Sequence, residues 1–137
     1  MNLVRVLGRM HVRLYRLTGG RFVGRVAKSP ILLLTTTGRR SGLPRTTPLL
    51  YLQDGTRLAI VASFGGHPTH PVWYLNLAAN PEVQVQVGRD RFSATARTAD
   101  AEERERLWLQ VVEMYPGYAR YQEKTSREIP VVVLERS

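Results

Sequence analysis

The stretch TTPLLYLQDGTRLAIVAS, residues 46–63, holds two apolar runs on either side of the pair Asp54-Gly55. An Asp-Gly pair between apolar runs is a strong hairpin signal, because glycine adopts the positive φ that tight turns require. We therefore expect a strand over 46–53 and a return strand over 57–63, paired antiparallel. This hairpin is the starting point for the rest of the fold.

Four other segments have the composition of short strands. Residues 83–87, VQVQV, alternate apolar and polar side chains with period two, which indicates a half-buried strand. The remaining expected strands are 31–37, 91–97 and 129–135. Six short strands at this spacing predict a small antiparallel barrel.

Helices are expected at two places between the strands. Residues 71–80 begin with a proline, which suits the first turn of a helix, and stop before Asn80-Pro81. Residues 100–115 begin with Asp100 and carry Glu103 three positions later, close to a capping box. The predicted fold class is α+β, with helices flanking the strands of a single domain over 1–137.

The chain contains no cysteine, and its positive charge is concentrated in the first part. Without thiols, disulfides, zinc-thiolate sites, iron–sulfur clusters and thiol catalysis are excluded. Residues 1–53 carry ten lysines and arginines and no acid, whereas residues 54–137 carry ten bases and eleven acids. A basic, acid-free block favours anionic partners such as phosphates, nucleic acid or an anionic membrane.

Residues 1–20 are expected to form a basic amphipathic helix, with an apolar stripe opposite four arginines. One interpretation is a surface helix packed on the domain. The other, slightly favoured by the absence of acids, is a helix lying on an anionic membrane. No apolar run approaches the ~20 residues of a transmembrane helix, and the segment lacks the apolar centre of a secretory signal, although it overlaps in character with a transit peptide.

The segment TTTGRRSGLPRTTPL, residues 35–49, joins two expected strands with more side-chain chemistry than a turn needs. Glycines permit close approach of a ligand, and the guanidinium groups of Arg39, Arg40 and Arg45 match phosphate or carboxylate oxygens. The pattern indicates a site for a phosphate or a polyanionic tail, with a solvated basic hairpin as the alternative. The sequence lacks both the lysine of a Walker A (P-loop) motif and the Rossmann glycine fingerprint.

In the segment ASFGGHPTHPVWYLN, residues 62–76, a strand ends at Ser63, two glycines follow and a helix begins. Exposed amides at that helix start can bind an anion or the edge of an electron-rich ring, and an ordinary strand-to-helix loop is the alternative. His67 and His70 have no acidic partner nearby, so no metal site is expected.

In the segment MYPGYARY, Tyr115, Tyr118 and Tyr121 repeat at intervals of three. On a helix they would form an aromatic wall, which either packs in the core or lines a pocket for a flat substrate. No serine hydrolase motif, catalytic carboxylate pair or His–Asp pair stands out. If the protein is an enzyme, its chemistry is expected to belong to a bound cofactor.

Taken in order, residues 35–49, 61–87 and 114–133 closely resemble the deazaflavin-dependent nitroreductase family, a branch of the flavin/deazaflavin oxidoreductase superfamily. The likeness runs from about Ile31 to Glu135. It implies a split β-barrel that binds coenzyme F420, an 8-hydroxy-5-deazaflavin with a phospholactyl-oligoglutamate tail. It also implies an oxidoreductase that transfers a hydride from the reduced cofactor to a quinone, menaquinone-like, or to an activated nitro or enone acceptor.

The resemblance also implies the site residues. The tail would be held by Arg39, Arg40, Ser41 and Arg45. The other cofactor-binding residues would be Thr46, Thr47, Pro48, Leu49, Leu50, Val61, Ala62, Ser63, Phe64, Val72, Trp73, Tyr74, Leu75 and Asn76. The catalytic residues, as hydrogen-bond donors to the acceptor oxygen, would be Tyr118, Ser63, Tyr115 and Tyr121. Relatives often have lysine where Arg40 and Phe64 stand here, and the second difference removes a charge beside the ring.

Three alternatives make different predictions. An FMN-dependent reductase of the same barrel would bind one phosphate, for which three arginines are more than needed. A non-catalytic deazaflavin carrier would not need an acceptor pocket lined by tyrosines. Specific nucleic-acid binding is not expected, because the basic segment lacks interleaved aromatics and a known motif. We expect a cytoplasmic protein, with peripheral contact at the inner face of the cell membrane if the N-terminal helix docks there.

Overall fold

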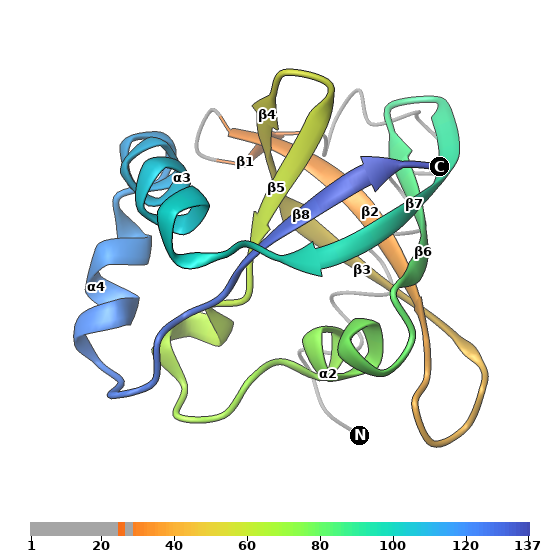
Figure 1. The fold of residues 1–137 in the computed structure, drawn as a ribbon, viewed down its shortest axis with the longest axis horizontal. Coiled ribbons are helices and arrows are strands. Elements are labelled where there is room, and N and C mark those ends of the chain that lie inside the picture. Colours follow the sequence, from red (N-terminus) through yellow and green to blue (C-terminus); the bar gives the residue numbers. More distant parts are fainter. Residues whose placement is uncertain (1–24, 27–28) are drawn as a thin grey trace.

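The computed structural model describes residues 25–26 and 29–137, and in these ranges eight strands form one curled antiparallel sheet (Figure 1). The strands are β1 (Arg25–Val26), β2 (Ser29–Thr37), β3 (Pro44–Leu50), β4 (Leu52–Asp54), β5 (Arg57–Val61), β6 (Glu82–Val87), β7 (Asp90–Thr98) and β8 (Val131–Arg136). Their order is β1-β2-β6-β7-β8-β5-β4, and β3 pairs with β2. The helix predicted over 1–20 lies outside the described residues.

The strand predicted over 46–53 is divided at Tyr51 into β3 and β4. All seven residues of β3 pair with β2, whereas β4 pairs with β5. At the division, the Tyr51 amide donates a hydrogen bond to the Pro30 carbonyl at 3.1 Å. The two halves of one apolar run, β3 and β4, therefore pair with β2 and β5, which lie far apart in the sheet order. This change of pairing partner curls the sheet into a barrel.

The predicted hairpin between β4 and β5 is confirmed, but its loop begins one residue later than Asp54-Gly55. Asp54 pairs with Arg57, so the two loop residues are Gly55 and Thr56. Gly55 has a φ of 60° at the first loop position. This is the position at which type II′ hairpin turns require glycine.

Three helices and one short 3-10 turn connect the strands of the described part: η1 (Phe64–Gly66), α2 (Val72–Ala79), α3 (Ala101–Met114) and α4 (Gly117–Glu123). The Asp100 side chain caps α3 as predicted, accepting from the Glu103 amide at 2.9 Å. Pro71 is the N-cap of α2, with an extended ψ of 152°, and not a residue of its first turn. In Figure 1, α3 and α4 lie together on one side, and α2 lies at the lower end of the barrel.

Alternation along the strands divides the apolar side chains between the inside of the barrel and its outer face. The residues that fill the interior are Leu32, Leu34, Leu58, Ile60, Ala62, Trp73, Leu77, Val83, Val85, Ala94, Ala96, Val132 and Leu134. On the outer face of β5 and β8, Ala59 and Val133 pack with Leu107 of α3. Val61 packs on the same face with Val111 and Tyr118 of the two helices. The barrel thus presents a second core, under α3 and α4, next to the end of β5.

Candidate functional site

The arginine loop, residues 38–45, leads from β2 into β3 and carries the three arginines of the predicted tail site. The Gly38 amide donates to the Leu43 carbonyl, and the Gly42 amide donates to the Gly38 carbonyl, both at 2.8 Å. A Cβ on Gly38 would lie 2.5 Å from Ser41 Oγ and 3.2 Å from the Leu43 oxygen. The loop is therefore a compact turn, and any side chain at its first residue would displace that of Ser41.

Arg39, Arg40 and Arg45 are exposed, as is Ser41. Within the described ranges no carboxylate lies at ion-pairing distance from these three arginines. Their positive charge is thus not neutralised by an acid among these residues. Guanidinium groups in this state are suited to bidentate binding of phosphate or carboxylate.

Asn76 joins the arginine loop to α2. Its side chain is 2% exposed; Oδ1 accepts from the Arg39 amide at 3.0 Å, and Nδ2 donates to Thr36 Oγ1 at 3.2 Å. A buried amide with both polar ends bound holds its neighbours in one arrangement. The structure therefore brings together Arg39 and Asn76, which belong to different segments of the predicted site.

The β3 residues of the predicted site divide between two faces. Thr47 and Leu49 pair with barrel-lining residues of β2, and Arg45 shares their face opposite the buried Thr36. The other face carries Thr46, Pro48 and Leu50. Thr46 Oγ1 lies 2.8 Å from Thr35 Oγ1 on that face. A ligand along one face of β3 therefore meets the side chains of only one of the two sets.

The chain leaves β5 through buried Val61 and Ala62, and Ser63 is 9% exposed. Phe64 then projects outward with 53% of its surface exposed and a φ of 46°. A bulky side chain at positive φ is uncommon, and it persists only where the surroundings hold it. The Phe64 ring lies 4.8 Å from the His67 ring, centroid to centroid.

Gly66 brings this turn directly against α4. Its φ is 80°, and a Cβ at this position would lie 2.7 Å from the Tyr121 carbonyl oxygen and 3.0 Å from the Tyr121 Cα. Only glycine permits two backbones to approach so closely. The end of β5 and the tyrosine segment, far apart in the sequence, therefore form one structural unit.

The predicted wall on α2 points in several directions. Trp73 is buried in the barrel core, whereas Val72 is 65% exposed. The Tyr74 hydroxyl lies 3.0 Å from Thr98 Oγ1, and Leu75 is half-buried. Of these four side chains, Val72 alone is exposed.

The three tyrosines gather, although they do not lie on one helix. Tyr115 follows the end of α3 in an extended conformation, because Pro116 cannot continue the helix, and the other two belong to α4. The Tyr115 and Tyr121 hydroxyl oxygens are 3.2 Å apart, and the Tyr118 ring meets the Tyr115 ring edge-on at 5.0 Å. Tyr118 is 5% exposed and packs against Val61.

Two phenols of this trio, those of Tyr118 and Tyr115, have altered acidity. Burial raises the pKa of Tyr118, and the hydrogen bond with Tyr121, followed by burial, raises the pKa of Tyr115. A tyrosine hydroxyl is protonated at neutral pH with or without such a shift. A protonated phenol can donate a hydrogen bond to an oxygen that gains negative charge.

Arg127 lies between α4 and β8 and is not among the site residues predicted from the sequence. Its guanidinium donates to the carbonyl oxygens of Ser63 at 2.8 Å, His67 at 2.9 Å and Ala62 at 3.3 Å. Its Nη1 also lies 3.2 Å from His70 Nδ1, and burial, followed by the charge of Arg127, lowers the pKa of His70. No local pattern marks an arginine whose partners are distant backbone carbonyls, so only the fold reveals it.

The two histidines of the predicted loop do not converge. His67 Nδ1 lies 2.9 Å from Thr69 Oγ1, whereas His70 faces Arg127. Among the residues that the structure describes, no group of three or more acids and histidines is placed to hold a metal ion. The same residues include no helix long and apolar enough to cross a membrane.

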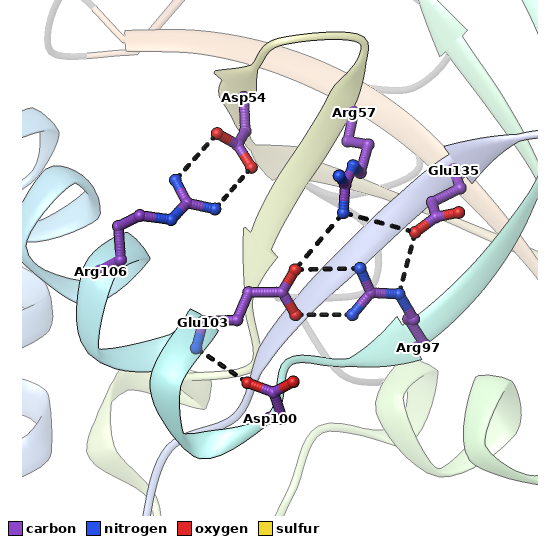
Figure 2. A network of polar contacts seen from close by, with 7 residues as sticks. All are labelled: Asp54, Arg57, Arg97, Asp100, Glu103, Arg106 and Glu135. Carbon is purple, nitrogen blue, oxygen red and sulfur yellow. Dashed lines mark hydrogen bonds and ion pairs between the residues drawn. The ribbon is translucent and has the colours of Figure 1, made fainter.

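A second cluster of arginines lies beside the N-terminal end of α3, and we call it the α3 network (Figure 2). Its members are Asp54, Arg57, Arg97, Asp100, Glu103, Arg106 and Glu135. Glu103 accepts hydrogen bonds from Arg97 at 2.6 and 2.9 Å, and Arg106 binds both oxygens of Asp54 at 3.1 Å. These hydrogen bonds lower the pKa of Glu103 and of Asp54. Every guanidinium of the network has a carboxylate partner, so the network ties α3 to the sheet.

Comparison with known proteins adds three findings. The model of the F420H(2)-dependent quinone reductase family matches residues 7–136. An F420H(2)-dependent quinone reductase of Mycobacterium tuberculosis is 48% identical over 132 residues, which cover 93% of this chain and 89% of the relative. A solved F420-H2 dependent reductase (FDR-A) is 50% identical, with a TM-score of 0.72 over 77% of this chain and 94% of that one.

A more distant likeness concerns the fold alone. The heme storage protein HutZ of Vibrio cholerae is 16% identical, with a TM-score of 0.61 over 93% of this chain and 89% of that one. Together with the pairing of the strands, these matches confirm the predicted α+β split barrel.

Proposed function

The chain belongs to the F420H(2)-dependent quinone reductase family, and on this premise we propose that it transfers a hydride from reduced coenzyme F420 to a quinone. The observation that carries the proposal is the arginine loop. Three exposed arginines have no acidic partner among the described residues, and their loop is tied to α2 by Asn76. Such a site suits a ligand with several negative charges better than one with a single phosphate.

We assign the residues of the proposed site to the parts of the cofactor in turn. Arg39, Arg40 and Arg45, with the Ser41 hydroxyl, would bind the phosphate and glutamates of the tail. The end of β5 from Val61 to Phe64 would lie along the ring, because its glycine-containing turn permits close approach of a flat group. Further members of the proposed site are Thr46, Thr47, Pro48, Leu49, Leu50, Val72, Trp73, Tyr74, Leu75 and Asn76.

When bound, the reduced deazaflavin supplies the hydride. The protein would hold the acceptor so that a hydroxyl donates to its oxygen as negative charge develops there. Tyr118 is our first candidate for this donor, and Ser63, Tyr115 and Tyr121 are the others. Geometry supports the role, because Tyr118 packs against Val61 at the end of β5 and the Tyr115 and Tyr121 hydroxyls lie 3.2 Å apart in the same cluster.

The test begins with the cofactor. Titration of the purified protein with coenzyme F420, followed by quenching of its fluorescence, should give saturable binding, and FMN should bind about tenfold more weakly or worse. Catalytic oxidation of the reduced cofactor by menadione should follow. Tight FMN binding without quenching of the deazaflavin would contradict the proposal.

A substitution separates an enzyme from a carrier. Tyr118→Phe removes one hydroxyl and keeps the packing, so we expect kcat with menadione to fall roughly tenfold while the Kd for coenzyme F420 stays within about twofold. Nitro and enone acceptors are compared in the same assay. Binding without turnover of any acceptor would support a carrier instead.

We also propose that residues 1–20 bring the protein to the inner face of an anionic membrane, where a lipid quinone resides. The support is the sequence alone, because four arginines and no acid accompany the apolar stripe. Co-sedimentation with anionic vesicles should decrease when residues 1–17 are removed. Equal pelleting of both proteins would refute the membrane role.

A further inference from the structure

The carbonyl groups that Arg127 binds belong to the turn at the end of β5. Ala62, Ser63 and His67 each offer an oxygen to the same guanidinium, which reaches them from the segment between α4 and β8. One side chain thus holds three peptide groups of a loop by their carbonyl oxygens. A planar fork with five donors can do this, and the point charge of a lysine cannot.

Holding these carbonyls fixes the direction of the neighbouring amides. No cis peptide bond occurs in the described residues, and in a trans peptide the N–H points opposite to the C=O. Since the Ala62 and Ser63 carbonyls face Arg127, the Ser63 and Phe64 amides face away from it. In the described part of the chain neither amide donates to a protein acceptor.

The backbone at this point has the form of an anion-binding nest. Ser63 is right-handed, with φ −75° and ψ −39°, and Phe64 is left-handed, with φ 46°. Successive residues of this kind direct their amides into one concavity, which attracts a negatively charged or partly negative oxygen. The positive φ of Phe64 is costly for a bulky residue and must be held by its surroundings. The Gly66 amide, which donates to the Ser63 carbonyl at 2.9 Å, is one restraint, and Arg127 on the same carbonyl is a second.

We propose that Arg127 is a positioning residue that holds the Ser63–Phe64 nest open toward an oxygen of the bound deazaflavin ring. The inference rests on the proposed function, because the ring is the ligand that Val61 to Phe64 would meet. Arg127 acts through the backbone of Ser63 and does not itself contact the ligand. The arginine loop binds the tail, and Arg127 prepares the site for the ring.

Four variants test this role. Arg127→Gln and Arg127→Lys should each raise the Kd for coenzyme F420 about tenfold, because neither side chain can donate hydrogen bonds to all three carbonyl oxygens. Arg104→Gln is the matched control. Arg104 also binds a backbone carbonyl, that of Ile129 at 2.9 and 3.0 Å, but none at the end of β5. The Kd of the Arg104→Gln variant for coenzyme F420 should stay within about twofold of the wild-type value. In Arg127→Ala, added methylguanidinium should recover part of the lost affinity.

A second measurement separates positioning from charge. The salt dependence of binding should remain as in the wild type when Arg127 is changed to Gln, because the tail and its arginines are intact. In the protein without cofactor, amide resonances from Ser63 to His67 should shift in Arg127→Gln and remain in place in Arg104→Gln. Full affinity in Arg127→Lys, or unchanged resonances in Arg127→Gln, would overturn the inference. Absence of F420 binding by the wild type would instead refute the proposed function, and the resonances would still test the grip of Arg127.

Discussion

The arginine loop and the α3 network are both rich in arginine, and they differ in what surrounds the guanidinium groups. In the α3 network, Arg97 binds Glu103 through two hydrogen bonds and Arg106 binds Asp54 in the same way (Figure 2). In the arginine loop, Arg39, Arg40 and Arg45 have no carboxylate partner among the described residues. The same type of side chain therefore has two uses. In the α3 network it holds structural elements together, and in the arginine loop it remains available to bind a ligand.

The difference shows that local acid content decides which arginines can serve a ligand. A guanidinium already bound to a carboxylate must lose that partner before it takes another, and the exchange returns little free energy. A guanidinium with no such partner gives up only water, so a charge-assisted hydrogen bond to its ligand returns a larger net gain. Counting arginines by composition alone would have treated the two regions as equal.

The largest effect is expected when the arginine loop loses its charge. The double variant Arg39→Gln, Arg45→Gln should raise the Kd for coenzyme F420 about 100-fold, because it removes two of the charge-assisted contacts that we propose for the tail. Fluorescence titration gives the Kd. The double variant Arg57→Gln, Arg106→Gln removes the same net charge from the α3 network. It should change the Kd by less than about twofold, and an equal loss in both proteins would erase the distinction between the regions.

The next effect concerns the tie between the arginine loop and α2. Asn76→Ala leaves the Arg39 amide and the Thr36 hydroxyl without their partner at a buried position, so the free energy of unfolding should fall by about 2 kcal/mol. Urea unfolding measures it. The control is Asn80→Ala, at an exposed asparagine whose side chain accepts from the Glu82 amide at 3.2 Å, with a loss of about 0.5 kcal/mol. Equal losses would mean that Asn76 does not hold the loop.

A smaller effect is expected in the α3 network, and it should depend on pH. The hydrogen bond from Arg97 lowers the pKa of Glu103 in the folded protein below its ordinary 4.5. The stability that the ionised carboxylate contributes is therefore complete above that value and is lost as the pH falls through the folded pKa. Wild type should exceed Glu103→Gln by about 1 kcal/mol at pH 7 in urea unfolding. A difference that persists at pH 2 would show that the ion pair is not its source.

The smallest expected effect is that of salt. Raising the ionic strength from 50 to 500 mM should weaken F420 binding by the wild type roughly threefold, because exposed charges are screened. The Arg39→Gln, Arg45→Gln variant should respond less, and the variant of the α3 network should respond like the wild type. The same titrations measure both dependences. A wild-type Kd that does not change with salt would argue against an electrostatic role for the loop.

The strands and the family could be predicted because their signals are local. The alternation in VQVQV and the Asp54-Gly55 pair mark β6 and the β4–β5 hairpin directly, and the three ordered segments identified the family. The division at Tyr51 could not be predicted, since the apolar run through it is continuous and only the two partner strands separate its halves. Periodicity does not encode such a change of partner.

The site residues also differ in whether a local sequence pattern marks them. The arginines of the loop stand out in the sequence by their number, whereas Arg127 acts on carbonyls some 60 positions earlier and has no local pattern. The spacing of the tyrosines suggested one helix, yet Pro116 places Tyr115 outside α4 and contacts between rings bring the trio together. The roles assigned to the individual site residues stay predictions that the variants above can test.

The last strand of the sequence, β8, lies inside the sheet between β7 and β5. Val61 thus finds its partner at Val131, seventy residues later in the chain. During synthesis, β5 and β7 leave the ribosome with facing edges that nothing yet fills, and exposed edges invite pairing with other chains. The barrel therefore closes only after β8 has been synthesised, and pairing over such a distance is typical of slow folding.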